Sequence, residues 1–171
     1  MVRVSLGTLA GLALLLPFAV QATPAPRMTI SSFEQIARPL PLPYDEKADA
    51  DAAVASARAR AKRAGKLLLI DLGGNWCLDC RILAGVMETQ PLTAWMAKRF
   101  EIVSVDVGRF DKNQQIQQSF GIKGRLEGVP ALLIVNPRTG KLVNAGRVTA
   151  LADARALTPQ ALADWFAGWA P

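Results

Sequence analysis

The residues of this sequence best suited to chemistry are its two cysteines, Cys77 and Cys80, in the stretch GNWCLDCRIL. Side chains three positions apart at a helix start share one face, close enough for a disulfide. Such a bond closes a very short loop, so it constrains the unfolded chain little and makes a poor structural staple. The pair is therefore a redox couple, half of a metal site, or an ordinary buried pair.

The absence of histidine narrows these choices. Every mechanism that needs an imidazole as base, nucleophile or ligand is excluded. Two thiolates make an incomplete zinc site, because zinc takes four ligands, and a Cu(I) or zinc module would need a second chain to complete it. We therefore favour a redox couple and keep a non-catalytic metal-binding or partner-binding module as the alternative. No cofactor is expected.

The positive charge of the chain does not indicate nucleic-acid binding. The formal charge of +6 comes from dispersed basic residues, and the single dense run is Arg58 to Arg63. That run lies in an alanine-rich helical pattern, which is typical of a solvated helix face. A nucleic-acid interface would need a broader basic surface or interleaved aromatic residues.

The N-terminus has the pattern of a secretory signal. Arg3 precedes an apolar run from Leu6 to Val20, and small residues follow at the end of VQA. Residues 1–22 are accordingly predicted to be a signal peptide, which places the mature protein in the periplasm or outside the cell. Export makes an isolated close cysteine pair more significant, because structural disulfides in oxidising compartments usually join distant segments.

The elements around the cysteines predict an α/β domain. The apolar run Lys66 to Leu72 predicts a buried strand, GGN a turn, and Cys77 to about Met87 a helix. Further helices are predicted over residues 45–64, 91–100, 111–120 and 158–170, and further strands over 101–107, 130–136 and 142–148. The expected fold is a three-layer α/β/α sandwich with a mixed central sheet and a C-terminal β-hairpin plus helix. Residues 23–44 are a proline-rich extended lead-in, and residues 45–171 form the domain.

The position of the pair predicts unequal roles for the two sulfurs. Cys77 falls at the helix N-terminus, where free backbone N–H groups and the helix dipole stabilise a thiolate. Cys80, one turn further in, should be more shielded. Cys77 would attack a partner disulfide, and Cys80 would resolve the mixed disulfide.

An ordered set of residues resembles the thioredoxin family over about residues 45–170. WCLDC is similar to the family's tryptophan-plus-CxxC site, and Asp71 on the preceding strand matches its buried acid. Arg81 matches a basic residue after the second cysteine, and GVPALLIV is similar to the segment with the cis-proline, here Pro130. Gly146 falls where the family has a strand glycine. The set is more specific than CxxC alone.

The resemblance implies roles for these residues. Asp71 would relay a proton during resolution by Cys80, unless it is merely an exposed strand-end acid. Trp76 would shield the disulfide and contact partners, and Pro130 would be cis, with the backbone of Val129 pairing with the substrate. The expected catalytic residues are Cys77, Cys80, Asp71, Trp76 and Pro130, and the expected substrate-binding residues are Val129, Trp76, Leu78 and Asp79.

The sequence also departs from the family pattern. Gly73 replaces an aromatic residue expected before the site, and Ile102 stands at about the place of a lysine often found near the buried acid. The loop Lys123 to Gly128 is longer than usual and should border the site, either selecting partners or serving as a surface insertion without a role.

Asp79 bears on the direction of electron flow. A carboxylate beside Cys77 disfavours its thiolate, and the histidine that stabilises the reduced form in strongly oxidising relatives is absent. We therefore expect a reducing couple that acts on protein thiols and disulfides. The nearest family type is the electron-delivering periplasmic domain of membrane thiol-transport proteins, which makes a membrane electron-transfer protein a candidate partner.

Overall fold

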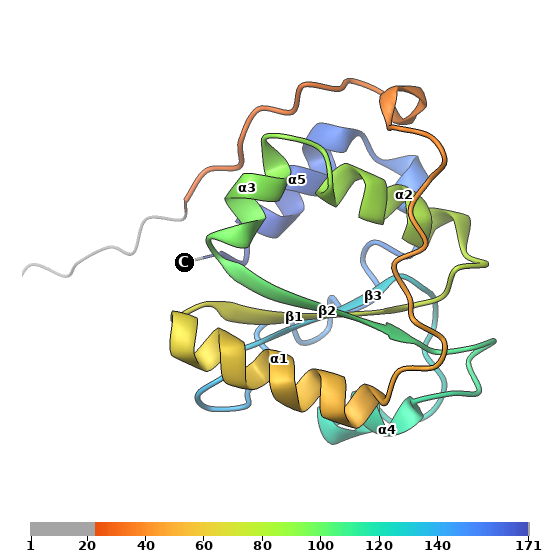
Figure 1. The fold of residues 1–171 in the computed structure, drawn as a ribbon, viewed down its shortest axis with the longest axis vertical. Coiled ribbons are helices and arrows are strands. Elements are labelled where there is room, and N and C mark those ends of the chain that lie inside the picture. The colour runs from red at the N-terminus through yellow and green to blue at the C-terminus, as the bar shows by residue number, and fades with distance from the viewer. Residues whose placement is uncertain (1–22, 171) are drawn as a thin grey trace, which may run out of the picture.

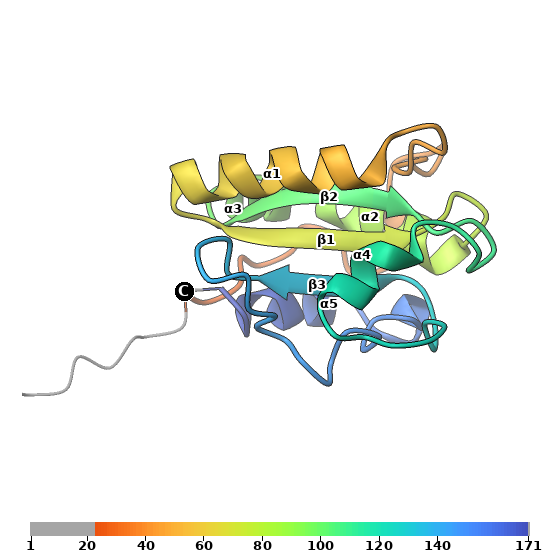
Figure 2. The same cartoon turned by 90° about the horizontal axis from the view of Figure 1, so that it is seen from below.

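A computed structural model describes residues 23–170, so the predicted signal peptide lies outside the described residues. The centre of the fold is a three-stranded sheet in the order β2–β1–β3 (Figures 1 and 2). Its strands are β1 (Leu67–Gly73), β2 (Phe100–Asp106) and β3 (Ala131–Val135). Strand β1 runs parallel to β2 and antiparallel to β3, which confirms the predicted mixed sheet.

Helices cover both faces of this sheet. They are α1 (Ala50–Ala64), α2 (Leu78–Met87), α3 (Leu92–Ala97), α4 (Gln114–Ser119) and α5 (Pro159–Ala167), with short 3₁₀ turns η1 (Phe33–Gln35) and η2 (Ala154–Ala156). Helices α2, α3 and α5 lie on one face, and α1 and α4 lie on the other (Figure 1). Within residues 23–170, no helix is both long and apolar enough to cross a membrane.

Strand β1 is apolar along its length because it is buried on both faces. Leu68, Ile70 and Leu72 pack into the core beneath α1 and α4, and Leu69 packs into the core beneath α2 and α5. A central strand covered on both sides needs a continuous apolar run rather than an alternating one. Asp71 is the polar exception in this strand, and it is fully buried.

The helix boundaries follow local signals in the sequence. The Asp49 carboxylate caps α1 by accepting a hydrogen bond from the Ala52 backbone N–H at 3.0 Å. Gly65 ends that helix with φ of +68°, in the left-handed region that glycine adopts without strain. Thr158 caps α5 and Pro159 takes its first position, where its missing N–H costs no hydrogen bond.

The predicted strand over residues 142–148 is not formed, so the predicted C-terminal β-hairpin is absent from residues 23–170, and this is a correction. The segment runs beside β3 but makes a single isolated bridge with it. Asn144 is the reason: its side-chain oxygen accepts from the Ile134 backbone N–H at 2.9 Å, and its amide donates to the Leu132 carbonyl at 2.7 Å. A buried side chain thus takes the place of part of the ladder, between backbone hydrogen bonds that join Val143 to Ile134 and Val148 to Leu132. Gly146 lies in a turn with φ of +75°, so it is not a strand glycine either.

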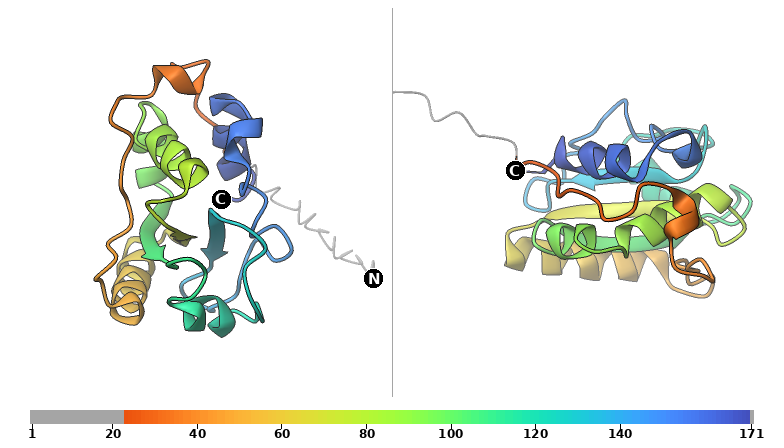
Figure 3. Two further views of the ribbon diagram at one scale, coloured as in Figure 1. Left: turned by 90° about the vertical axis from the view of Figure 1, so that its right-hand side faces the viewer. Right: turned by 90° about the horizontal axis from the view of Figure 1, so that it is seen from above.

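The proline-rich lead-in, residues 23–44, is packed against the domain. It is extended apart from η1, and it runs from the layer of α2 and α5 along the side of the molecule to α1 (Figure 3). Ile36 and Leu40 are buried in the core beneath α2. A Cβ added to Gly85 of α2 would lie 2.6 Å from Cγ2 of Ile36, so glycine allows this close approach.

Candidate active site

Cys77 and Cys80 form a disulfide at the start of α2, with their Cα atoms 5.3 Å apart. Cys77 is the N-cap of the helix, and its sulfur accepts a hydrogen bond from the Cys80 backbone N–H at 3.1 Å. Cys77 is 6% exposed and Cys80 is 0% exposed. The inner sulfur is therefore the more shielded of the two, as the sequence predicts, and the outer sulfur occupies the helix start, where backbone N–H groups favour negative charge.

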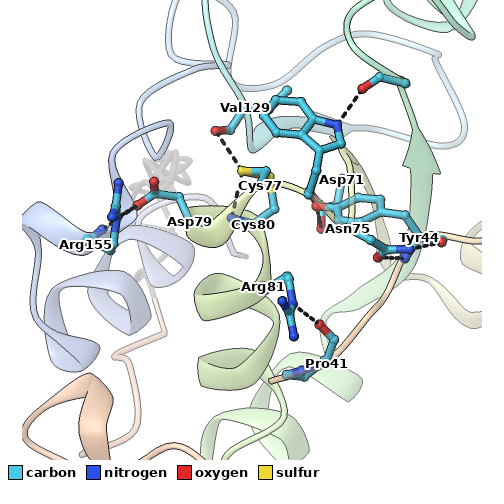
Figure 4. The surroundings of a disulfide bond; sticks show 12 residues. Pro41, Tyr44, Asp71, Asn75, Cys77, Asp79, Cys80, Arg81, Val129 and Arg155 are labelled. Atoms are coloured by element: carbon cyan, nitrogen blue, oxygen red, sulfur yellow. Dashed lines mark hydrogen bonds and ion pairs between the residues drawn. A yellow bond between two sulfur atoms is a disulfide. The ribbon is translucent and has the colours of Figure 1, made fainter. Parts of the chain in front are cut away.

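The segment before β3 lies against the outer sulfur. The Val129–Pro130 peptide bond is cis, as the family resemblance implies. The Val129 carbonyl oxygen is 3.5 Å from Cys77 Sγ (Figure 4). The disulfide sulfur carries no proton, whereas the reduced thiol could donate one to this carbonyl. Cys77 and Val129 thus face the same side of the site, although 52 positions separate them.

Asp71 lies in β1 and is completely buried, so it is not an exposed strand-end acid. Its two carboxylate oxygens each lie 3.0 Å from the Tyr44 hydroxyl (Figure 4). Burial raises the pKa of Asp71 from 3.8 to about 7, although the hydrogen bond from Tyr44 acts in the opposite direction. A carboxyl with this pKa can take up or release a proton near neutral pH.

Tyr44 is a residue of this site that the sequence analysis missed. It is the single tyrosine of the chain, it comes from the lead-in, and it is 2% exposed. Gly73 was the available signal, since an aromatic residue missing before the cysteines leaves space for one from elsewhere. The structure shows that space taken by Tyr44: a Cβ added to Gly73 would clash with the tyrosine hydroxyl.

Asp79, between the cysteines, is paired with a cation. Its Oδ1 accepts from the backbone N–H and from Nε of Arg155, both at 3.0 Å (Figure 4). The pair raises the pKa of Arg155. The sequence alone shows Asp79 as a negative charge beside Cys77, without this cation. Because Arg155 binds the carboxylate, Asp79 disfavours the Cys77 thiolate less than an unpaired carboxylate would.

Exposed apolar and aromatic side chains surround the outer sulfur. Trp76 is 40% exposed and Leu78 is 44% exposed. The Trp76 indole donates to the Gly108 carbonyl at 2.7 Å, and its ring lies 5.9 Å from that of Phe110. The Arg109 guanidinium stacks on Trp76, with its carbon 4.4 Å from the ring centroid. Trp76 is therefore held in place while one side stays open to a partner.

An open cleft of about 540 Å³ runs beside Cys77. It is lined by Trp76, Cys77, Leu78, Asp79, Phe110, Glu127, Gly128, Val129, Ala152, Asp153 and Arg155. The predicted loop Lys123 to Gly128 does border the site through its last two residues. In the same loop, the Arg125 guanidinium lies over the Phe110 ring at 4.3 Å. Every residue expected to bind substrate lines this cleft.

Arg81 and Ile102 lie away from the reacting sulfurs. The Arg81 guanidinium donates to the carbonyls of Leu40 and Pro41 at 3.0 and 3.1 Å, so it fastens the lead-in to α2. Ile102 is partly exposed on β2. In the part of the chain that the structure describes, no three or more Cys, Asp or Glu side chains come together as a metal-binding group.

Comparisons with known proteins agree with this geometry. Residues 49–137 match a family described as thioredoxin-like. A crystal structure of a disulphide isomerase from Xylella fastidiosa Temecula1 is 43% identical in sequence, with a TM-score of 0.68. The match covers 75% of this chain and 97% of that one. A protein of unknown function from Pseudomonas aeruginosa is 18% identical, with a TM-score of 0.35, over 67% of this chain and 80% of that one. A comparison with curated proteins gave no significant match.

Proposed function

Since the chain belongs to the thioredoxin-like family, we propose that it is an exported thiol–disulfide oxidoreductase that acts on protein disulfides in the reducing direction. The observation that carries the proposal is the asymmetry of the disulfide. Cys77 lies at a helix start in an open cleft, whereas Cys80 is fully buried. The Cys80 sulfur lies near the Tyr44 hydroxyl, which hydrogen-bonds to the buried Asp71. A structural disulfide needs neither an accessible sulfur nor a buried acid nearby.

The reaction uses the two sulfurs in turn. The Cys77 thiolate attacks one sulfur of a partner disulfide and expels the other as a thiolate, giving a mixed disulfide. Cys80 then loses its proton and attacks Cys77 Sγ. This re-forms the Cys77–Cys80 bond and releases the second partner sulfur, so two electrons pass to the partner. Asp71 is the buried group able to accept the Cys80 proton, because its pKa lies near neutrality.

The substrate would lie along the cleft beside Cys77. The exposed Leu78 and the open side of Trp76 offer apolar surface to a polypeptide. Val129 offers backbone groups next to the cis peptide bond. Main-chain hydrogen bonds read little of a partner's sequence, which suits an enzyme that acts on several protein disulfides.

Two observations support the reducing direction. The chain has no histidine to stabilise the reduced pair, as strongly oxidising relatives do. The Xylella protein is named a disulphide isomerase, and isomerisation, like reduction, begins with attack by a reduced cysteine. The Asp79 argument carries less weight, because Arg155 pairs with that carboxylate. Equilibration with glutathione tests the direction: a potential near or above about −120 mV would rule it out.

Export and the source of electrons are parts of the same proposal. The charged and apolar pattern of residues 1–22 supports a cleaved signal, and a membrane electron-transfer protein is the proposed reductant of Cys77–Cys80. A fusion of residues 1–22 to a reporter that is active only after export tests the first part. Recovery of the reporter in the cytoplasm would contradict it.

The central experiment is a trap for the mixed disulfide. With Cys80→Ser, resolution is blocked, so partner proteins should accumulate on Cys77 as adducts that a thiol reductant releases. The matched control is Cys77→Ser, which keeps one cysteine but leaves it buried, and it should trap nothing. Adducts in neither variant, or equal adducts in both, would overturn the proposal.

A further inference from the structure

The backbone of Tyr44, in the lead-in segment, is fixed by two hydrogen bonds to one side chain of the domain. Its backbone N–H donates to Asn75 Oδ1 at 3.2 Å, and Asn75 Nδ2 donates back to the Tyr44 carbonyl at 2.8 Å. Asn75 lies two residues before Cys77, in the turn that leads into α2. Two reciprocal bonds to a side chain fix both position and orientation of the tyrosine backbone.

The same segment is held on the other side of the disulfide by Arg81, which binds the carbonyls of Leu40 and Pro41. The residues just before and just after the cysteine pair thus both hold the end of the lead-in (Figure 4). A tyrosine whose own backbone and whose preceding residues are both held loses little freedom when its phenol hydrogen-bonds, so the hydroxyl is preorganised toward Asp71.

Gly73 brings the tyrosine hydroxyl and the inner sulfur to one small space. A Cβ added there would clash with the Tyr44 hydroxyl and would lie 2.9 Å from Cys80 Sγ. The hydroxyl therefore lies near two groups: the carboxylate of Asp71, with which it is hydrogen-bonded, and the sulfur of Cys80, which borders the same space beside the Cα of Gly73.

From this geometry we infer that Tyr44 is a proton-relay residue of the thiol–disulfide reaction, whose hydroxyl carries the proton of Cys80 to the carboxylate of Asp71. The inference deepens the proposed function and rests on it. It assigns a role in the chemistry to a residue outside the part of the chain that matches the family.

The proton transfer balances without any further reactant. In the mixed disulfide, the Cys80 thiol gives its proton to the Tyr44 oxygen while the Tyr44 hydroxyl proton passes to Asp71. Tyr44 is a neutral phenol before and after this step, Asp71 becomes a carboxylic acid, and Cys80 becomes the thiolate that attacks Cys77. The expelled partner thiolate takes a proton from solvent, and Asp71 returns its proton to solvent afterwards.

The charges around Asp71 are compatible with this path. Tyr44 hydrogen-bonds to it from the lead-in, and its neighbours across the sheet, Ser104 and Leu132, are uncharged. Asp106, at the end of β2, contributes to the raised pKa of Tyr44 through its negative charge. The Asp106 carboxylate itself lies 3.4 Å from the Lys112 ammonium.

The protonation states of the two residues agree as well. Burial, followed by the charge of Asp71, raises the pKa of Tyr44, so its hydroxyl stays protonated at neutral pH and donates to the carboxylate. That hydrogen bond lowers the pKa of Asp71 against the effect of burial. Removing the hydroxyl should therefore shift the ionisation of Asp71 to higher pH.

The test separates attack from resolution. Reduced protein is mixed in single turnover with a peptide joined by a disulfide to a chromogenic thiol, between pH 5 and 9. Attack by Cys77 on the peptide sulfur releases the chromophore, and resolution by Cys80 then releases the fluorescently labelled peptide. Tyr44→Phe keeps the ring and removes only the hydroxyl. Leu42→Ala, at an exposed position of the same segment, is the matched control.

We expect Tyr44→Phe to leave attack within about twofold of the wild type and to slow resolution at pH 7 at least about tenfold. The pH midpoint of resolution, and that of the Asp71 carboxyl carbon followed by ¹³C NMR, should move to higher pH. Adding Tyr44→Phe to Asp71→Asn should cost no further rate, because both act on one proton path.

Three results would overturn the inference: unchanged resolution in Tyr44→Phe, an unmoved midpoint, or losses that add fully in the double variant. These outcomes differ from failure of the proposed function, in which the wild type would release no chromophore at all.

Discussion

The substitution Asp71→Asn should abolish an unusual contribution to the pH dependence of stability. Burial raises the pKa of this carboxyl from 3.8 to about 7 in the folded protein, whereas in the unfolded chain it stays near its ordinary value. Between about pH 4 and pH 7 the folded state therefore binds more protons at this position than the unfolded state. Stability conferred by the protonated acid is complete below about pH 4 and falls as the pH rises to about 7.

The size of the effect follows from the same values. The pKa of Asp71 in the folded state exceeds that in the unfolded state by about three, which corresponds to about 4 kcal/mol in the free energy of unfolding. This is a large part of the ~5–15 kcal/mol typical of a domain. Asparagine cannot ionise, so the variant lacks this term. The buried amide N–H group of the introduced asparagine lacks an acceptor, which costs about 1–3 kcal/mol at every pH. This cost does not change how stability varies with pH.

Urea unfolding of the oxidised protein at half-unit steps from pH 4 to pH 8 measures this term. The stability of Asp71→Asn relative to wild type should rise by about 4 kcal/mol across the series. The exposed Asp153→Asn is the matched control and should give a flat difference. The reasoning is refuted if the difference between Asp71→Asn and wild type is equally flat.

Three other substitutions test separate features of the structure. Gly85→Ala should destabilise the protein and speed proteolysis of residues 23–44, although alanine usually stabilises a helix interior by about 0.5–1 kcal/mol, because its Cβ meets Ile36; in an Ile36→Ala background the cost should vanish, and a cost that persists there would point away from this contact. Asn144→Ala should cost about 2–4 kcal/mol in chemical denaturation, since it leaves two buried backbone groups of β3 unpaired, and a loss under about 0.5 kcal/mol would contradict that account. Arg155→Ala should lower the thiolate fraction of Cys77 in the reduced protein, followed by absorbance at 240 nm, and Asp79→Asn should restore it; an unchanged thiolate fraction would show that the ion pair does not act on the sulfur.

Local patterns were sufficient to predict most elements of the fold. The apolar run of β1 and the position of Cys77 at a helix start both depend on neighbours within a few residues. The strand predicted over residues 142–148 failed because alternating apolar residues do not reveal that one buried side chain, Asn144, supplies hydrogen bonds in place of the ladder.

The parts of the site that escaped prediction depend on long-range contacts. The Asp79 carboxylate is paired with Arg155, 76 positions away, and a single sequence contains no sign of that partner. Tyr44 lies 27 positions before Asp71, in a segment whose prolines indicated only an extended linker. The cysteines, Asp71 and Pro130 were found because their spacing is characteristic of a family. Tyr44 was not, because it fills the space that Gly73 leaves open, and Gly73 is a departure from the family pattern.

The packing of the lead-in limits how this domain can be cut out and reused. Engineers who trim a protein to the boundaries of its recognised family would begin near residue 49 and end near residue 137. Such a fragment would keep both cysteines and the cis peptide bond, but it would lose the phenol on Asp71, the carbonyls that bind Arg81, and the whole of α5. The segment that must be kept for the site to stay intact is therefore longer than the segment that matches the family. It begins within residues 23–44, whose sequence resembles a spacer.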